Sequence, residues 1–156
     1  MRRSEFPPGL SETAFEFFYW FSRFEFALKS NRYLRNSKAG AIAEPGWKNF
    51  VTTWQNGYVL SVSAQALITA APKQQLVGEG EQIIWAPVAL GDRSSDLERV
   101  VILLKTVRNN LFHGGKHGDA NWDDPTRTKS LLMCGKNVID ELAEMSGLGP
   151  DYTRYY

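Results

Sequence analysis

The chain has only one cysteine and two histidines among its 156 residues. The single cysteine, Cys134, excludes a disulfide within the chain and most metal sites built from cysteine. The formal net charge is +1, which neither indicates nor excludes a nucleic-acid partner, because a basic patch can be hidden in a neutral total. No apolar run reaches the length of a membrane span, and Pro7 and Pro8 interrupt any signal-peptide core. We therefore expect a cytoplasmic protein that does not contact membranes.

Four stretches of the chain have the apolar periodicity of helices, at about 11–34, 47–70, 96–113 and 125–145. Ser11 is expected to cap the first helix. Ser95 and Glu98 form a capping box before the third. Asp124 followed by Pro125 predicts the start of the fourth, because proline is favoured at the first helical position.

The segments around these helices contain the glycines and prolines. Gly57 is expected to bend or split the second helical region, because glycine costs about 1 kcal/mol relative to alanine inside a helix. Residues 71–93 hold three glycines and two prolines, so we expect an irregular insertion in which QLV and QIIW form short strands at most. The tails, 1–10 and 147–156, are expected to be irregular. We predict a single domain over 1–156, an all-α bundle of four or five helices.

The first predicted helix, ETAFEFFYWFSRFEFALK, is aromatic on several faces. Such a helix is expected at the centre of a bundle or in contact with a second subunit. Its two apolar stripes are Ala14, Phe18, Phe21 and Leu28, and Phe15, Tyr19 and Phe26. Three tryptophans offer surfaces for base stacking, although we expect most of them to pack in the core: Trp47, Trp54 and Trp85.

Two charged residues interrupt the apolar stripes of the predicted helices. Glu25 shares the stripe of Phe21, and Arg108 shares the stripe of Leu104. Burying either charge alone would cost several kcal/mol. We therefore expect the two side chains to face each other or to line a wet cleft. Two interpretations follow, a structural ion pair between two helices and a polar active site.

The third predicted helix closes with RNNLFHGG, residues 108–115. Arginine suits phosphate recognition, because its planar fork binds two oxygens at once. Histidine suits proton transfer near neutral pH. Arg108 and His113 are about 140° apart around an ideal helix, but arginine's length and the glycines that follow would let both reach one phosphate. Asn109 and Asn110 offer hydrogen bonds at the same end.

These residues resemble the R-x4-6-H motif of the HEPN domain family. In that family a polar residue commonly follows the arginine, as Asn109 does here. The aromatic first helix with its embedded Glu25 is similar to the first helix of the family. The motif also stands in a late helix that is followed by one more helix. The similarity in architecture covers most of the chain, whereas the motif itself is short.

The resemblance implies a helical homodimer that acts as a metal-independent endoribonuclease without a cofactor. Many relatives of this kind belong to toxin–antitoxin and anti-phage systems, so RNA is the expected substrate and an antitoxin or another defence-system protein the expected partner. The resemblance implies catalytic roles for Arg108, His113 and Asn109, supporting roles for Glu25 and Asn110, and RNA binding by Lys116 and His117.

The chemistry of RNA cleavage independently favours a site shared by two subunits. Metal-free cleavage uses the 2′-OH as an internal nucleophile, and it needs a proton acceptor, a proton donor and a cation. One His113 cannot conveniently act as acid and base at once, whereas a two-fold dimer supplies each group twice. The products would be a 2′,3′-cyclic phosphate and a 5′-OH. DNA would not be cut, because it lacks the 2′-OH.

Three alternatives to a HEPN ribonuclease are also compatible with the sequence. One is a catalytically silent HEPN-like module that binds a nucleotide or a partner protein. Another is an unrelated helical interaction protein with the aromatic first helix as its partner face. The third is a metal site at His113 and His117, which are spaced by four as on a zinc-binding helix. We expect no metal, because Gly114 and Gly115 should break that helix and no third ligand is evident.

Overall fold

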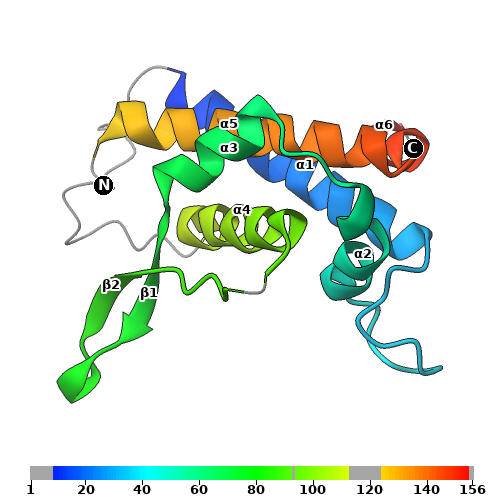
Figure 1. Ribbon diagram of the computed structural model, residues 1–156, viewed down its shortest axis with the longest axis horizontal. Coiled ribbons are helices and arrows are strands. Elements are labelled where there is room, and N and C mark those ends of the chain that lie inside the picture. The colour runs from blue at the N-terminus through cyan, green and yellow to red at the C-terminus, as the bar shows by residue number, and fades with distance from the viewer. Residues whose placement is uncertain (1–8, 93, 113–123, 155–156) are drawn as a thin grey trace.

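The computed structural model describes residues 9–92, 94–112 and 124–154. Over these residues the protein is mostly helical, with a small two-stranded sheet (Figure 1), so the predicted helical class is confirmed. The helices are α1 (Leu10–Ser30), α2 (Trp47–Trp54), α3 (Val62–Ala70), α4 (Asp96–Phe112), α5 (Pro125–Met145) and α6 (Gly149–Thr153), and the strands are β1 (Lys73–Val77) and β2 (Ile83–Pro87). In the described part, no helix combines the length and apolar character needed to span a membrane.

Helix α1 begins and ends differently from the prediction. Its N-cap is Gly9, at a left-handed φ of 80°, and no side chain caps it, so the expected cap at Ser11 is wrong. The helix ends at Ser30, before the expected Leu34. Arg32 takes a positive φ of 64° there, and the N–H of Tyr33 donates to the carbonyl of Leu28. This is the hydrogen-bond pattern of a Schellman end, in which a left-handed residue terminates the helix.

The buried face of α1 differs from both predicted apolar stripes. Phe21 and Leu28 of the first stripe are buried, but Phe18 of that stripe is 41% exposed, and Phe17, which belongs to neither stripe, is fully buried. The reason is the close approach of α5, whose Gly135 lies so near that a Cβ there would be 2.6 Å from the Phe17 ring. The buried residues of α1 are Leu10, Phe17, Phe21, Phe24, Ala27 and Leu28.

The second helical region is split at Gly57, as predicted. Helix α2 ends at Trp54, a 3-10 turn covers Gln55–Gly57, and the chain is extended at Tyr58. Helix α3 then begins after Ser61, whose hydroxyl accepts a hydrogen bond from the N–H of Ala64 at 3.0 Å. The predicted second helical region is therefore two short helices, α2 and α3, separated by the 3-10 turn and the extended residues that follow it.

The insertion at 71–93 is more regular than expected. Strands β1 and β2 form an antiparallel hairpin in which Leu76 pairs with Ile84 and Gln75 with Trp85. The prediction of an irregular insertion is therefore wrong, and the hypothesis of short strands at QLV and QIIW is confirmed. β-branched and aromatic residues favour this pairing. The hairpin projects away from the helices (Figure 1).

The starts of α4 and α5 follow their predicted caps. The hydroxyl of Ser95 accepts a hydrogen bond from the N–H of Glu98 at 3.2 Å. The carboxylate of Asp124 accepts from the N–H of Thr126 at 2.8 Å, and Pro125 is the first residue of α5. The predicted end of the third helix at Gly114 lies outside the described residues, as does the predicted N-terminal tail before Gly9.

The C-terminal segment is not an irregular tail, so that prediction is wrong. Helix α6 packs against α1. The Tyr152 side chain is 4% exposed. The Arg23 guanidinium of α1 donates to the backbone carbonyls of Asp151, Tyr152 and Arg154 at 2.6, 3.1 and 2.9 Å. This long-range contact fixes a segment whose composition alone favours a loose end.

Candidate functional site

Glu25 and Arg108 face each other where α1 and α4 meet. Arg108 Nη2 lies 3.6 Å from Glu25 Oε2, and the two side chains are 34% and 20% exposed. The expectation that these charges pair is therefore confirmed. Their neighbours Phe24 and Val107 are fully buried, so the pair lies at the edge of the core. The guanidinium is held by protein groups and still reaches solvent.

Three more side chains fix the position of this pair. Trp47 Nε1 donates to Glu25 Oε1 at 3.0 Å, so each carboxylate oxygen has its own partner. Arg108 Nη1 donates to Asn109 Oδ1 at 2.9 Å. The guanidinium carbon lies 5.4 Å from the centre of the Phe21 ring, within the range of a cation–π contact. Arg108 is therefore oriented by a carboxylate, an amide and a ring.

Asn110 lies apart from this network. Its side chain is 6% exposed, and its Nδ2 donates to the carbonyl of Lys73 at 2.8 Å. That bond joins β1 to α4. Asn110 is two positions from Arg108, about 200° around the helix. The structure therefore gives this residue a contact that attaches the hairpin, and Asn110 also lines a cavity together with Asn109.

The remaining predicted site residues, His113, Lys116 and His117, lie outside the described residues. His113 follows directly after Phe112, the last described residue of α4. Among the described residues, no group of three or more metal-binding side chains is present.

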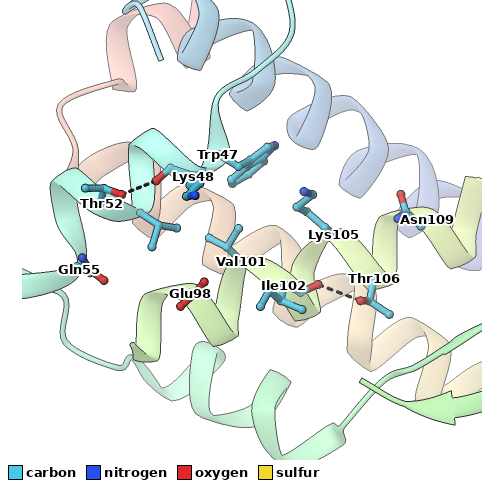
Figure 2. Close-up of a pocket in the computed structure, with 11 residues that line it drawn as sticks. Trp47, Lys48, Thr52, Gln55, Glu98, Val101, Ile102, Lys105, Thr106 and Asn109 are labelled. Atoms are coloured by element: carbon cyan, nitrogen blue, oxygen red, sulfur yellow. Dashed lines mark hydrogen bonds between the residues drawn. The ribbon is translucent and has the colours of Figure 1, made fainter. Parts of the chain in front are cut away.

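Three adjoining cavities run along α4, and together we call them the α4 groove. The first, of about 520 Å³, lies between α2 and α4 (Figure 2). The second, of about 540 Å³, shares Trp47, Lys48 and Lys105 with the first and extends to Glu25. The groove therefore reaches the carboxylate that holds Arg108.

The third cavity extends the groove toward the hairpin. It has a volume of about 250 Å³ and shares Thr106 and Asn109 with the first cavity. Its other lining includes Gln74 and Gln75 of β1. Figure 2 shows Lys105 and Asn109 along the same edge of α4. Asn109 thus belongs both to the groove and to the network around Arg108.

Four exposed aromatic rings form a second surface feature on α1 and α4. Phe18 of α1 stacks on Phe112 of α4 with ring centroids 5.9 Å apart. Phe15 stacks on Tyr19 at 6.1 Å. All four side chains are exposed, by 40% to 64%, and we call them the aromatic patch. Phe112 is about one turn beyond Arg108.

Sequence reasoning missed the contribution of Trp47 to the site. Trp47 was expected in the core, and its side chain is indeed only 6% exposed. Its indole N–H nevertheless reaches out to Glu25. A tryptophan at the start of a short helix carries no signal of this contact, because the partner is set by how α2 docks on α1. Trp54 and Trp85 are half-buried.

Comparisons of the chain with protein-family models, with curated proteins and with solved structures found no match.

Proposed function

We propose that the protein is a metal-independent endoribonuclease of the HEPN type, which cleaves RNA at a site built from two copies of the chain. The observation that carries the proposal is the Arg108 guanidinium, held by Glu25 and Asn109 at a solvent-accessible edge of α4. A cation that is already oriented suits a phosphate that gains charge during reaction, because little reorganisation is needed. The setting proposed with it is toxin or anti-phage defence, with an antitoxin or similar protein as partner.

In this proposal Arg108 binds the scissile phosphate and steadies its extra negative charge. The 2′-oxygen forms a bond to phosphorus while the bond from phosphorus to the 5′-oxygen breaks. One His113 takes the proton of the 2′-OH, and the His113 of the second copy donates a proton to the 5′-oxygen. The products are a 2′,3′-cyclic phosphate and a 5′-OH. Asn109 keeps the guanidinium oriented.

The aromatic patch supports the dimer that this mechanism needs. Phe15 and Phe112 are 64% and 63% exposed, and aromatic side chains are enriched in the cores of protein interfaces. Contiguous exposed apolar surface of this kind marks interaction sites. Isologous contact through the patch would bring both copies of Arg108 near the two-fold axis, because Phe112 lies about one turn from Arg108.

The test of the activity is cleavage of mixed RNA by the purified protein in EDTA. Arg108→Ala and His113→Ala should each lose at least about 100-fold in rate, because each removes a group that acts in the transition state. Arg99→Ala is the matched control, because Arg99 lies on the same helix but pairs with Asp96. We expect cyclic-phosphate ends and no cleavage of DNA of the same sequence. A folded, dimeric wild-type protein that leaves RNA intact would contradict the proposal.

The alternative function is a non-catalytic HEPN-like module that binds a nucleotide or a partner protein. The observation that favours it is the cavity of about 520 Å³ between α2 and α4, which is in the size range of small-ligand sites. In that case the Glu25–Arg108 pair is purely structural.

Glu25→Gln separates these two functions, because it removes the charge and keeps an oxygen for the Trp47 indole. A partly exposed ion pair contributes at most about 1 kcal/mol, so both functions predict a small loss of stability. If Glu25 positions Arg108 for chemistry, kcat should fall by about 10-fold with little change in KM. If the pair is structural, the variant should retain ligand binding, and no cleavage should be found in the wild-type protein.

A further inference from the structure

The α4 groove carries two lysines whose charge is not neutralised. Lys48 of α2 and Lys105 of α4 line the same two cavities, and both side chains are exposed. Neither forms an ion pair within the described part of the chain. Arg35, which lines the outer cavity, is different, because Glu44 lies 3.2 Å away. Lys48 and Lys105 are therefore two cations at the groove without an ion-pair partner among the described residues, and the lining also holds the carboxylates of Glu25, Glu44 and Glu98.

Lys105 is well placed to bind a phosphate next to one held by Arg108. It precedes Arg108 by three residues, so the two lie on neighbouring faces of α4, about 4.5 Å apart along its axis. The groove extends from there past Lys48 to Asn49. Its other branch passes Asn109 toward β1. The first cavity shares lining residues with each of the other two, so the three form one path that a chain of phosphates could follow.

We propose that the α4 groove binds the phosphate backbone of single-stranded RNA, with Lys48 and Lys105 as backbone-binding residues on one side of the scissile phosphate. The proposal rests on the proposed function and extends it to the path of the substrate. Its two larger cavities, of about 520 and 540 Å³, are in the size range of small-ligand sites, which suits single nucleotides rather than a duplex. Amide side chains such as Asn49 and Asn109 supply further hydrogen bonds to the strand.

The groove reads the backbone rather than the bases. Trp47 is the aromatic residue in its lining, and its side chain is only 6% exposed, so it offers little surface for base stacking. Lysine contacts with phosphate carry no sequence information. Affinity in the groove should therefore depend strongly on salt and weakly on sequence. Glu98 lines the first cavity as well, and its repulsion directs the strand toward the lysine edge.

The lysine branch of the groove and the aromatic patch lie at different positions along α4. Lys105 is about one turn before Arg108, and Phe112 is about one turn after it. In a dimer formed through the patch, the branch of each groove that passes Lys105 would lead away from the two-fold axis. One strand would then enter through one groove and meet the shared site at the centre.

The test measures RNA affinity separately from cleavage. The His113→Ala protein is titrated into fluorescein-labelled single-stranded RNA of mixed sequence, with fluorescence anisotropy as the readout over a range of salt concentrations. Adding Lys48→Gln or Lys105→Gln should weaken binding several-fold, and each should reduce the slope of log affinity against log salt by about 0.7, the value for one lost phosphate contact on a single strand. Lys129→Gln is the control, because Lys129 lies on α5 and lines no part of the groove.

The possible results distinguish failure of the groove assignment from failure of the proposed ribonuclease function. If the wild-type protein cleaves RNA but the groove variants keep the affinity and salt slope of the control, the groove assignment is overturned and the proposed function stands. If the groove variants lose RNA affinity while the wild-type protein cleaves nothing, the groove stands and the ribonuclease fails. Equal or tighter binding of a duplex of the same sequence would overturn the single-strand assignment. The absence of RNA binding by the His113→Ala protein at low salt would overturn the groove assignment itself.

Discussion

The hydroxyl of Tyr58 is buried in the link between α2 and α3. No hydrogen-bond partner is found for it among the described residues. Burial, with the nearby carboxylates of Glu141 and Asp96, raises the pKa of Tyr58 to about 12. Because the pKa in the folded state lies above the ordinary value of 10.0, the folded protein holds this proton more tightly than the unfolded chain. The resulting stability is complete below pH 10 and is lost as the pH rises from 10 to about 12.

Tyr58→Phe should therefore reduce the alkaline loss of stability. The variant lacks the ionisation, so its free energy of unfolding should fall less between pH 10 and 12 than that of the wild-type protein. At pH 7 it should be as stable or slightly more stable, because an unsatisfied hydroxyl has been removed. Urea unfolding at each pH measures both effects. Tyr152, whose pKa is also raised by burial and by its hydrogen bond to Asp140, accounts for a remaining fall. An unchanged pH dependence would show that the Tyr58 hydroxyl is solvated.

Single residues were predictable where burial imposes a cost. The pairing of Glu25 with Arg108 followed from the sequence. A lone charge on an apolar stripe carries a large desolvation penalty, and an opposite charge beside it offsets that penalty. The Trp47 contact was not predictable, because it depends on the docking of α2. Asn110 shows the same limit, since its buried bond to the Lys73 carbonyl depends on a hairpin that the sequence indicated only weakly.

Gly135 decides how helix α5 approaches α1. A Cβ at this position would lie 2.6 Å from Cε2 of Phe17, which is fully buried, so the ring or one of the helices must shift. Alanine is favoured over glycine inside a helix by about 1 kcal/mol, whereas overpacking of a core costs about 1–3 kcal/mol. Gly135→Ala should therefore lower the free energy of unfolding by a net roughly 0–2 kcal/mol. Chemical denaturation of the variant and of the wild-type protein measures this difference in the free energy of unfolding.

The control for that change is Gly57→Ala, in the exposed 3-10 turn after α2, where a Cβ would meet nothing within 4 Å. We expect a change within about 0.5 kcal/mol. A Gly135→Ala protein that is more stable than wild type would show that the α1–α5 contact relaxes easily.

Among the secondary-structure elements, the capping residues predicted where α4 and α5 begin, whereas the apolar pattern did not predict which face of α1 is buried. Asp124 and Ser95 cap their helices as predicted, because capping depends on a few adjacent residues. The inner face of α1 was not identified from the sequence, because aromatic residues occupy both candidate stripes and the close approach at Gly135 selects Phe17, which belongs to neither. Helix α6 was missed because its order comes from Arg23, far away in the sequence.

The whole molecule has an uneven distribution of exposed apolar surface. The aromatic patch joins α1 and α4 beside Arg108. A second group of exposed apolar residues lies on the hairpin, where Leu76 pairs with Ile84 and Val77 with Ile83. Val62 of α3, at 90% exposure, lies outside the aromatic patch. The proposed mechanism needs two copies of His113, so oligomeric state and activity should change together.

Phe15→Glu should convert the protein into a folded monomer without ribonuclease activity. A charge in the centre of a desolvated interface is strongly unfavourable, whereas Phe15 is 64% exposed in the single chain, so folding should survive. Light scattering after size exclusion gives the mass, circular dichroism the helix content, and cleavage of RNA in EDTA the activity. Val62→Glu, which also places a glutamate at an exposed apolar position, should stay dimeric and active. On dilution, the activity per chain should fall for wild type and for Val62→Glu alike as the dimer dissociates. A monomeric Phe15→Glu protein that cleaves RNA at the wild-type rate would refute the shared site, because one chain would then supply both proton-transfer groups.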